Sequence, residues 1–121
     1  MAKSPGDQRL ELLQGTLDML ILRTLQWGPQ HGHGIGQMIR QQSDDLLKVE
    51  TDSLYPALHR LVKRGWLKTD WGLSKANQRA KFYRLTPEGK KQLVREESRW
   101  TQLVNAIGRV MKPASSQGTE E

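Results

Sequence analysis

The stretch Thr51-Asp-Ser-Leu-Tyr-Pro-Ala-Leu-His-Arg-Leu-Val-Lys-Arg-Gly65 predicts a helix with one apolar face and one polar, basic face. At about 100° per residue, apolar side chains spaced three and four residues apart form a single stripe. The stripe consists of Leu54, Leu58, Leu61 and Val62. The polar side consists of Asp52, Pro56, His59, Arg60 and Lys63, flanked by Ser53, Tyr55 and Arg64. We therefore expect the stripe to face a core and the polar side to remain free for a partner.

The ends of this helix are marked by residues that start and stop helices. Proline is tolerated near a helix start, so the helix is expected to begin within a few residues of Pro56. Thr51, Asp52 or Ser53 would then be the N-cap. Gly65 would end the helix. An ordinary amphipathic surface helix would show the same pattern, so the surrounding sequence has to distinguish the two interpretations.

The positive charge of the chain is concentrated around this helix. The 121 residues carry a formal net charge of +6, yet residues 51–91 alone contain ten Lys or Arg and three Asp or Glu. Such a block favours a polyanionic partner, most commonly a nucleic acid. The chain has no cysteine, which excludes disulfides and thiolate metal sites. No apolar run of about 18 residues or signal-peptide pattern occurs, so we expect a cytoplasmic protein without membrane contact.

Two further helices are predicted before the basic one. Residues 10–27 carry apolar side chains on more than one face, which predicts a helix covered on two sides, by a second chain or by the C-terminal helix. Thr16 and Asp18 offer an internal start signal for it, and an earlier start is the alternative. A second, short helix would serve as the first helix of a helix-turn-helix pair. Its buried face would consist of Ile35, Met38 and Ile39.

Two histidines, His31 and His33, lie in the glycine-rich segment between these helices. A zinc site needs a third ligand at a recognisable spacing, which this segment lacks. A turn in which the histidines cap a helix or contact phosphate is therefore favoured over a metal site. We expect neither a metal nor another cofactor.

After the basic helix the pattern alternates with a period of two, which predicts β-strands at residues 66–71 and 81–85. The polar segment between them is predicted to be the loop of a β-hairpin, and it contains Lys75 and Arg79. Helix, turn, basic helix and hairpin follow in the order of a winged helix-turn-helix. In that motif the second helix enters the major groove and the loop flanks it.

A long helix is predicted towards the C-terminus, up to about Met111. Thr86 is a typical N-cap and Pro87 suits the first helical position. Apolar residues recur along this helix in a heptad-like seam. They are Leu93, Trp100, Leu103, Val104, Ile107, Val110 and Met111. A seam on a helix that follows a small domain predicts an oligomerisation element rather than extra core.

The predicted fold is mostly α-helical with a small β-hairpin: a winged helix-turn-helix followed by a long C-terminal dimerisation helix. The predicted boundaries are a flexible N-terminal arm at 1–9, the DNA-binding domain at 10–86, the dimerisation helix at 87–111 and a disordered tail at 112–121. The arm and the tail are assigned from their polar composition and their lack of an apolar period.

Five segments of the chain resemble the PadR family of bacterial transcriptional regulators, in the order and spacing of that family. They are Leu13-Gln-Gly-Thr-Leu-Asp-Met-Leu-Ile-Leu22, Gly28-Pro-Gln-His-Gly32, Ser53-Leu-Tyr-Pro-Ala-Leu-His-Arg-Leu61, Lys63-Arg-Gly65 and Arg79-Ala-Lys-Phe-Tyr-Arg-Leu-Thr-Pro-Glu-Gly89. The resemblance implies a homodimeric winged-helix repressor whose C-terminal helix packs against the partner's N-terminal helix, and whose DNA is released by an inducer. The family commonly has tyrosine where this chain has His33, which leaves the role of that ring open.

The leading hypothesis is a sequence-specific regulator that binds a double-stranded DNA operator. The predicted DNA-binding residues are Ser53, Tyr55, Pro56, His59, Arg60 and Lys63 in the major groove, and Lys75, Arg79 and Lys81 over phosphate or the minor groove. For Tyr55, a position in the core is an equal alternative. The predicted homodimer interface consists of Leu17, Leu20, Leu93, Trp100, Leu103, Val104 and Ile107. Trp100 would either fill this interface or line a pocket for a small aromatic effector, as in some members of the family that the chain resembles.

Two other classes of function compete with this hypothesis. An enzyme is disfavoured, because no nucleophile, base and orienting acid can be assembled and no phosphate-binding glycine loop is present. A protein-interaction module that uses the C-terminal helix, with only nonspecific nucleic-acid affinity, is the main alternative. Competition by nonspecific DNA separates the two, because only a regulator keeps a complex with its operator.

Overall fold

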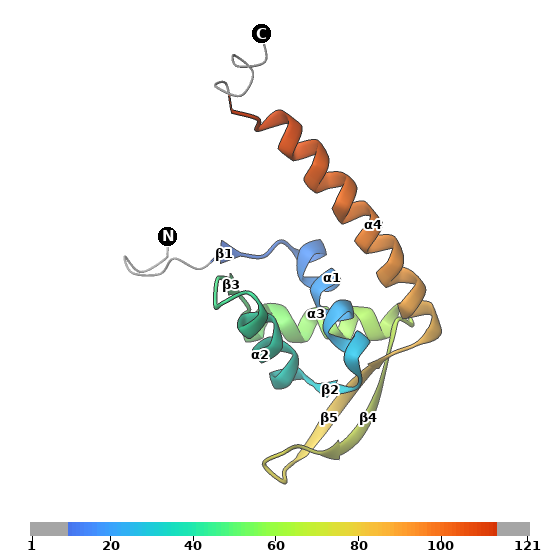
Figure 1. The fold of residues 1–121 in the computed structure, drawn as a ribbon. Helices are drawn as coiled ribbons and strands as arrows, with labels where there is room; N and C mark the ends of the chain where they lie inside the picture. Colours follow the sequence, from blue (N-terminus) through green and yellow to red (C-terminus); the bar gives the residue numbers. More distant parts are fainter. Residues whose placement is uncertain (1–9, 114–121) are drawn as a thin grey trace.

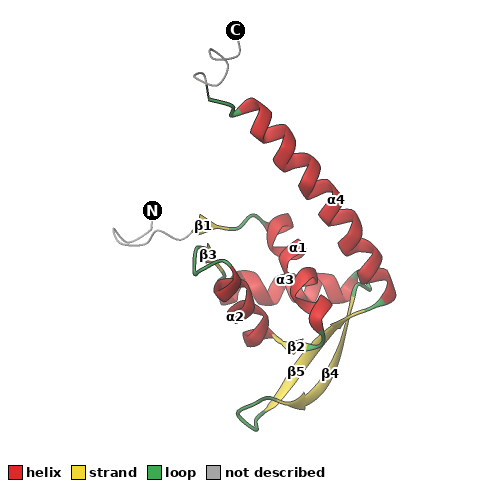
Figure 2. Cartoon of the chain, in the orientation of Figure 1, coloured by secondary structure: helices red, strands yellow, loops and turns green. Residues whose placement is uncertain are grey.

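The computed structural model describes residues 10–113, which form a helical body, a protruding hairpin and a long final helix (Figures 1 and 2). In chain order the elements are β1 (Leu10–Glu11), α1 (Gln14–Thr24), a 3₁₀ turn (Leu25–Trp27), β2 (Gln30–His31), α2 (Gly32–Gln42), β3 (Leu47–Lys48), α3 (Thr51–Lys63), β4 (Leu67–Leu73), β5 (Arg79–Leu85) and α4 (Pro87–Val110). The predicted fold class is confirmed. The predicted arm and residues 114–121 of the predicted tail lie outside the described residues.

The core lies where α1, α2 and α3 meet the base of the sheet. Its side chains with almost no exposed surface are Ile21, Leu22, Ile35, Leu58, Leu61 and Leu67. The predicted stripe of α3 contributes to this core, since Leu54 is also buried and Val62 packs against the cluster. Burial of this apolar area fixes which side of α3 faces inward, and therefore which side faces solvent.

Helix α3 begins earlier than its proline suggests, so the predicted N-cap is wrong. The N-cap is Glu50, which makes no side-chain cap hydrogen bond. Its carbonyl instead accepts hydrogen bonds from the backbone N–H groups of Ser53 and Leu54, at 3.0 and 2.8 Å. Pro56 therefore lies in the second turn, where it cannot donate to the carbonyl of Asp52. This is tolerated because both residues lie on the exposed side of the helix, within reach of water.

The single helix predicted for residues 10–27 is divided into three elements. Residues 10 and 11 are extended, because β1 pairs with β3 in parallel and the Leu10 N–H donates to the Leu46 carbonyl at 2.6 Å. Helix α1 then begins after Leu13, without a side-chain cap. The helix therefore begins before Thr16, the alternative that the sequence left open, and Asp18 accepts a hydrogen bond from Arg60 of α3.

The predicted hairpin is present and gains a third strand, so that the sheet has the order β2-β5-β4. Strand β2 pairs antiparallel with β5, with His31 opposite Phe82. A strand of two residues carries no detectable period, which explains why the sequence did not predict it. His31 also caps α2, since its Nδ1 accepts a hydrogen bond from the Gly34 N–H at 3.0 Å. Capping was one of the two roles predicted for the histidines.

Helix α4 begins at the predicted cap, Thr86, and its first turn also fixes it to the body. The hydroxyl of Thr86 donates to the Gly65 carbonyl at 2.6 Å and accepts from the Gly89 N–H at 3.0 Å. Gly89 lies directly against the Trp66 carbonyl, and a Cβ at this position would overlap that oxygen. Helix α4 then packs along α1 as far as the ion pair between Arg23 and Glu97, and its outer part extends away from the body (Figure 1).

We expect Gly89→Ala to lower the free energy of unfolding by about 1–3 kcal/mol, the usual range for overpacking against a fixed neighbour. The matched control is Gly108→Ala in the same helix, because an added Cβ there meets nothing within 4 Å. That control should gain stability, by up to about 1 kcal/mol. Urea unfolding followed by circular dichroism measures both, and equal stability of the two variants would contradict the contact.

Candidate nucleic-acid interface

The outer side of α3 is exposed and polar. Asp52, Ser53, Pro56, His59 and Lys63 are all solvent-exposed there, while the leucine stripe holds the other side against the core. The last turn carries positive charge at the end of the helix where cations are favoured. This side of α3 is therefore available to a large partner.

Tyr55 lies between the core and the exposed side of α3. Its ring covers the start of α2 so closely that a Cβ on Gly32 would lie 2.6 Å from the Tyr55 Cε1 atom. Burial raises the pKa of the nearby Tyr83 hydroxyl, and Tyr55 adds to that shift. Nevertheless 42% of Tyr55 remains exposed. The residue thus combines the two alternatives predicted for it, with part of the ring packed and part accessible.

Contrary to the prediction, Arg60 does not lie on the exposed face of α3. It lies on the flank of α3 that faces α1, where its Nη2 donates to the Asp18 carboxylate at 2.8 Å. The Arg60 side chain is 31% exposed, and that of Asp18 is 17% exposed. Helical spacing predicted Arg60 on the polar side itself. It could not show that Asp18 of α1 would draw the side chain towards the body.

One face of the hairpin packs on the body at its base and is exposed farther out. Alternate residues of a strand share a face, and Leu67, Tyr83 and Leu85 are buried at the base of the hairpin. Farther out, the same face of the paired strands carries exposed side chains. These are Trp71 opposite Lys81, and Leu73 opposite Arg79. We call these four residues the inner hairpin face.

Trp71 is a residue of this face that the sequence analysis missed. It is 60% exposed, and the Arg79 guanidinium lies 4.6 Å from the centre of its ring. Stacking of this kind holds a guanidinium in a defined orientation while leaving its edges free to donate hydrogen bonds. On the opposite face of the hairpin, Arg84 is instead paired with Asp70 at 3.2 Å. The signal that could have found it is a tryptophan at the end of a predicted strand, next to the basic loop.

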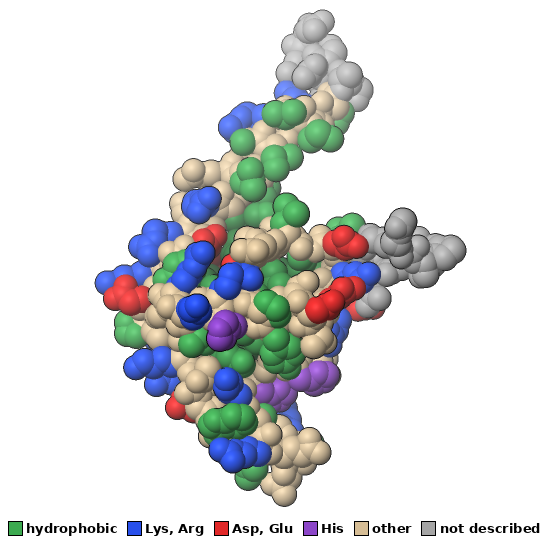
Figure 3. All heavy atoms as spheres, turned by 180° about the vertical axis from the view of Figure 1, so that it is seen from behind, with side chains coloured by type: hydrophobic (Ala, Val, Ile, Leu, Met, Phe, Trp, Pro, Cys, Tyr) green, Lys and Arg blue, Asp and Glu red, His purple; other side chains and the backbone are tan. Residues whose placement is uncertain are grey.

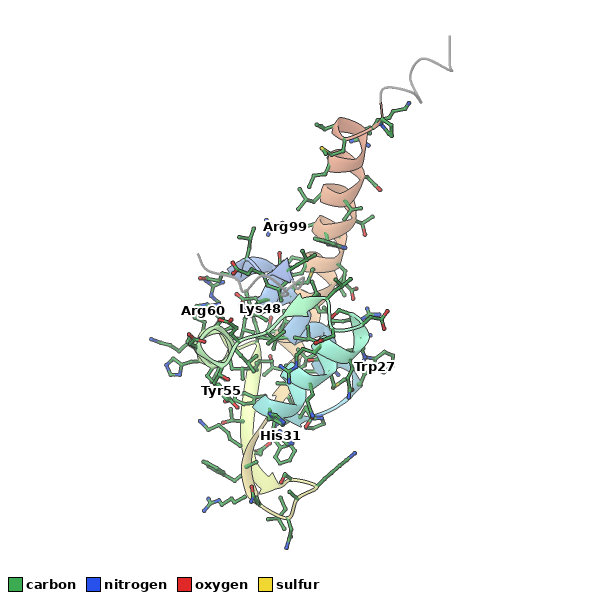
Figure 4. The ribbon with its side chains drawn as sticks, turned by 90° about the vertical axis from the view of Figure 1, so that its left-hand side faces the viewer. Trp27, His31, Lys48, Tyr55, Arg60 and Arg99 are labelled. Carbon is green, nitrogen blue, oxygen red and sulfur yellow. The ribbon has the colours of Figure 1, made fainter. Side chains whose placement is uncertain are left out.

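Tyr55 of α3 is close enough to Tyr83 to affect its pKa, and Tyr83 lies on the same face of the strands as the four residues of the inner hairpin face, so α3 and this face lie on one side of the molecule. Figure 4 shows Tyr55 and Arg60 on the side of α3, and several hairpin side chains project to the same side below them. Figure 3 shows Lys and Arg side chains over the body and the hairpin, with apolar side chains beside them on the hairpin. Lys75 lies exposed in the turn beyond the inner hairpin face. The arrangement joins a polar helix face to a basic, partly aromatic hairpin.

A second surface runs along α4. Trp100, Leu103, Val104 and Ile107 are 45–52% exposed, although they are large apolar residues. Trp100 and Leu103 also line a groove of about 590 Å³ between α1 and α4. The other lining residues are Leu13, Gly15, Thr16, Met19, Glu96, Arg99 and Gln102.

Two residues predicted for the dimer interface lie in the core instead, and a third is partly covered by that core. Leu17 and Leu93 are only 3% and 4% exposed, because they pack in the core of the same chain. Leu20 is partly buried against that core. The exposed seam therefore begins beyond Leu93 on α4.

Metal sites and membrane-spanning helices are two other features that residues 10–113 could contain. No group of three or more His, Cys, Asp or Glu side chains in this range is arranged to hold a metal ion. No helix in the same range has the length and apolar character needed to span a membrane.

Comparisons with known proteins agree with this architecture. Residues 21–95 match the model of the transcriptional regulator PadR-like family. A transcriptional regulator from Clostridium thermocellum is 32% identical, with a TM-score of 0.75 over 82% of this chain and 96% of that one. A PadR family transcriptional regulator from Eggerthella lenta is 29% identical, with a TM-score of 0.69 over 82% of this chain and 84% of that one. "Uncharacterized protein X" from Lysinibacillus sphaericus is 26% identical over 86% of this chain and 95% of its own length.

The family match covers more than half of the chain, and the likeness extends over most of the two solved structures. This chain therefore belongs to the PadR-like family of winged-helix, DNA-binding transcriptional regulators, which in general are not enzymes.

Proposed function

We propose that this protein is a homodimeric repressor that binds a specific operator in double-stranded DNA. The observation that carries the proposal is the position of the exposed side of α3 and the inner hairpin face on one side of the molecule. In a winged helix-turn-helix the second helix of the pair reads the major groove. A basic hairpin beside it is suited to phosphates or to the minor groove.

The residues of this interface take different roles in the proposal. Ser53, Pro56, His59 and Lys63 of α3 face the base edges, and Tyr55 borders them. Lys75 and Lys81 contact phosphates. Arg79, held against Trp71 at 4.6 Å, enters the minor groove, where a flat guanidinium fits better than an ammonium group.

The test begins with selection of genomic fragments by the purified protein. A selected fragment is then challenged with excess nonspecific DNA in a gel shift. A complex that survives the challenge supports a specific regulator. If nonspecific DNA competes as well as the selected fragment and the complex is lost, the alternative is supported. In that alternative α4 binds a protein partner and the basic surface has only general polyanion affinity.

We expect Lys63→Ala to weaken binding of the selected fragment about 5- to 150-fold, the range for a base-edge contact. Loss of a phosphate contact would instead weaken binding of all sequences alike and reduce the salt slope by about one unit. Lys68→Ala is the matched control. It removes the same charge from the opposite face of the hairpin, where Lys68 is exposed. Fluorescence anisotropy at several salt concentrations measures both, and equal effects of the two variants would contradict the assigned face.

The dimer is proposed from the course of the apolar stripe on α4. Leu93 lies in the core, and Trp100, Val104, Ile107 and Met111 continue the same side of the helix beyond the body. The helix is about 36 Å long, at about 1.5 Å per residue, and among the described residues its outer half extends beyond the body (Figure 1). A second copy of the chain, with its own α1 and α4, supplies a complementary apolar surface. Two-fold symmetry then presents two copies of α3 to two half-sites.

We expect Ile107→Asp to convert the dimer to a monomer and to abolish high-affinity binding of the selected fragment, because a buried charge at the interface is strongly unfavourable. Asn105→Asp adds the same charge to an exposed position off the stripe and should leave the dimer intact. Sedimentation velocity distinguishes the two. A stable Ile107→Asp dimer would show that the interface lies elsewhere.

We also propose that a planar aromatic effector binds beside Trp100. The groove between α1 and α4 already has a volume of about 590 Å³ and contains both apolar and charged side chains. Dimerisation would close it over a second Trp100. An effector releases DNA only if it binds more tightly to a conformation in which the two copies of α3 do not match the operator.

We expect planar aromatic compounds that do not themselves bind DNA to quench tryptophan fluorescence and to release the operator together. Trp100→Ala should lose both responses while remaining a dimer. Responses that survive unchanged in a dimeric Trp100→Ala protein, or the absence of any quenching compound, would mean that Trp100 only packs in the interface.

A further inference from the structure

An ion pair joins α1 to the flank of α3. The Arg60 Nη2 atom lies 2.8 Å from the Asp18 Oδ1 atom, and both side chains are mostly covered. The Arg60 Nε atom is buried and has no hydrogen-bond partner among the described residues. The guanidinium is therefore held on one side by a single carboxylate.

Burial makes this ion pair weak evidence for added stability. Burial raises the pKa of Asp18, and the attraction of Arg60 and Arg64 only partly offsets that effect, while Glu96 of α4 adds to it. An ion pair removed from water usually gains in mutual attraction about what it loses in hydration. The ion pair also restricts orientation, because a charged hydrogen bond is strong only at a defined distance and angle.

Apolar packing alone does not fix the rotation of α3 about its own axis. The buried stripe of Leu54, Leu58 and Leu61 holds the helix against the core, but apolar contact is non-directional and permits small rotations about the helix axis. His59 immediately precedes Arg60, and Lys63 lies three residues after it. Any rotation of α3 therefore displaces the residues proposed to meet base edges, where displacements of about an ångström break hydrogen bonds.

We propose that Asp18 is a positioning residue for DNA recognition: through Arg60 it fixes the rotation of α3, and with it the position of His59 and Lys63. The inference rests on the proposed function. It also changes the role of Arg60, which holds the recognition helix in place instead of contacting the operator.

The direction in which one substitution changes DNA affinity separates this proposal from simple electrostatics. Asp18→Asn removes a negative charge, so general attraction to DNA predicts tighter binding. It also frees Arg60 to turn towards a phosphate, which again predicts tighter binding. If Asp18 positions α3, the same substitution weakens binding of the selected sequence despite the gain in positive charge.

The experiment uses a duplex that the wild-type protein selects from a random library, and a shuffled duplex of the same composition. Asp18→Asn should bind the selected duplex about tenfold more weakly, within the range for coupled neighbours, and the shuffled duplex as well as the wild type does or slightly better. Arg60→Gln should show the same loss, and the double variant should lose no more than Arg60→Gln alone. Asp18→Glu, which keeps the charge, should recover most of the selectivity.

Glu97→Gln is the matched control for charge. Glu97 of α4 pairs with Arg23 of α1 at 2.5 Å, so this variant also breaks an ion pair on α1 and removes one negative charge, but away from α3. It should leave the ratio of the two affinities unchanged. Near-ultraviolet circular dichroism establishes that each variant is folded. If Asp18→Asn does not fold, Arg60→Lys replaces it, because it keeps the charge but loses the fork of donors.

Specific results would overturn the proposal. Equal or tighter binding of the selected duplex by folded Asp18→Asn, or an unchanged affinity ratio in Arg60→Lys, would overturn it while leaving the proposed function intact. If Arg60→Gln weakens both duplexes alike and lowers the salt slope by about one unit, Arg60 is instead a phosphate contact. If the wild-type protein selects no duplex at all, the proposed function fails, and the role of Asp18 fails with it.

Discussion

Burial of the leucine stripe on α3 is the constraint on which the rest of the structure depends. Leu58 and Leu61 have no exposed surface, and α1 and α2 pack around them together with the base of the sheet. Because a helix has one orientation that buries such a stripe, the same packing turns its polar side outward. The face available to a partner is therefore a consequence of the core. Apolar contact fixes the rotation of α3 only approximately, and the ion pair between Asp18 and Arg60 is proposed to restrict it further.

The hairpin and α4 both extend beyond the body, and in each the face that packs in the core continues into the extension. The two extensions differ in chemistry. On the hairpin the continuation is basic and aromatic, with Arg79 stacked on Trp71. On α4 it is apolar, because the side that carries Leu93 into the core continues through Trp100 and Ile107. A basic extension suits a polyanion and an apolar one suits another protein surface. The chain thus separates its two proposed partners, DNA and a second copy of itself, onto opposite ends of the molecule (Figure 1).

Sequence patterns predicted the elements that have a strong local cause. The apolar period of α3, the alternation of the hairpin, and the Thr86 and Pro87 start of α4 all act over a few residues, and the structure contains each of them. The exposed apolar seam of α4 was also predicted from its period. Leu93 was assigned to that seam because a heptad pattern does not reveal where the body of the same chain stops covering it.

The sequence by itself therefore determined the order of the main helices and the hairpin, the inward side of α3 and the concentration of positive charge around it. Only the tertiary structure decided the short strands β1 and β2, the position of Arg60 beside Asp18 and the exposure of Trp71. Local period and capping act through neighbouring residues and can be read along the chain. Pairing of a two-residue strand, or of two charges 42 positions apart, depends on where the packed core brings distant segments together.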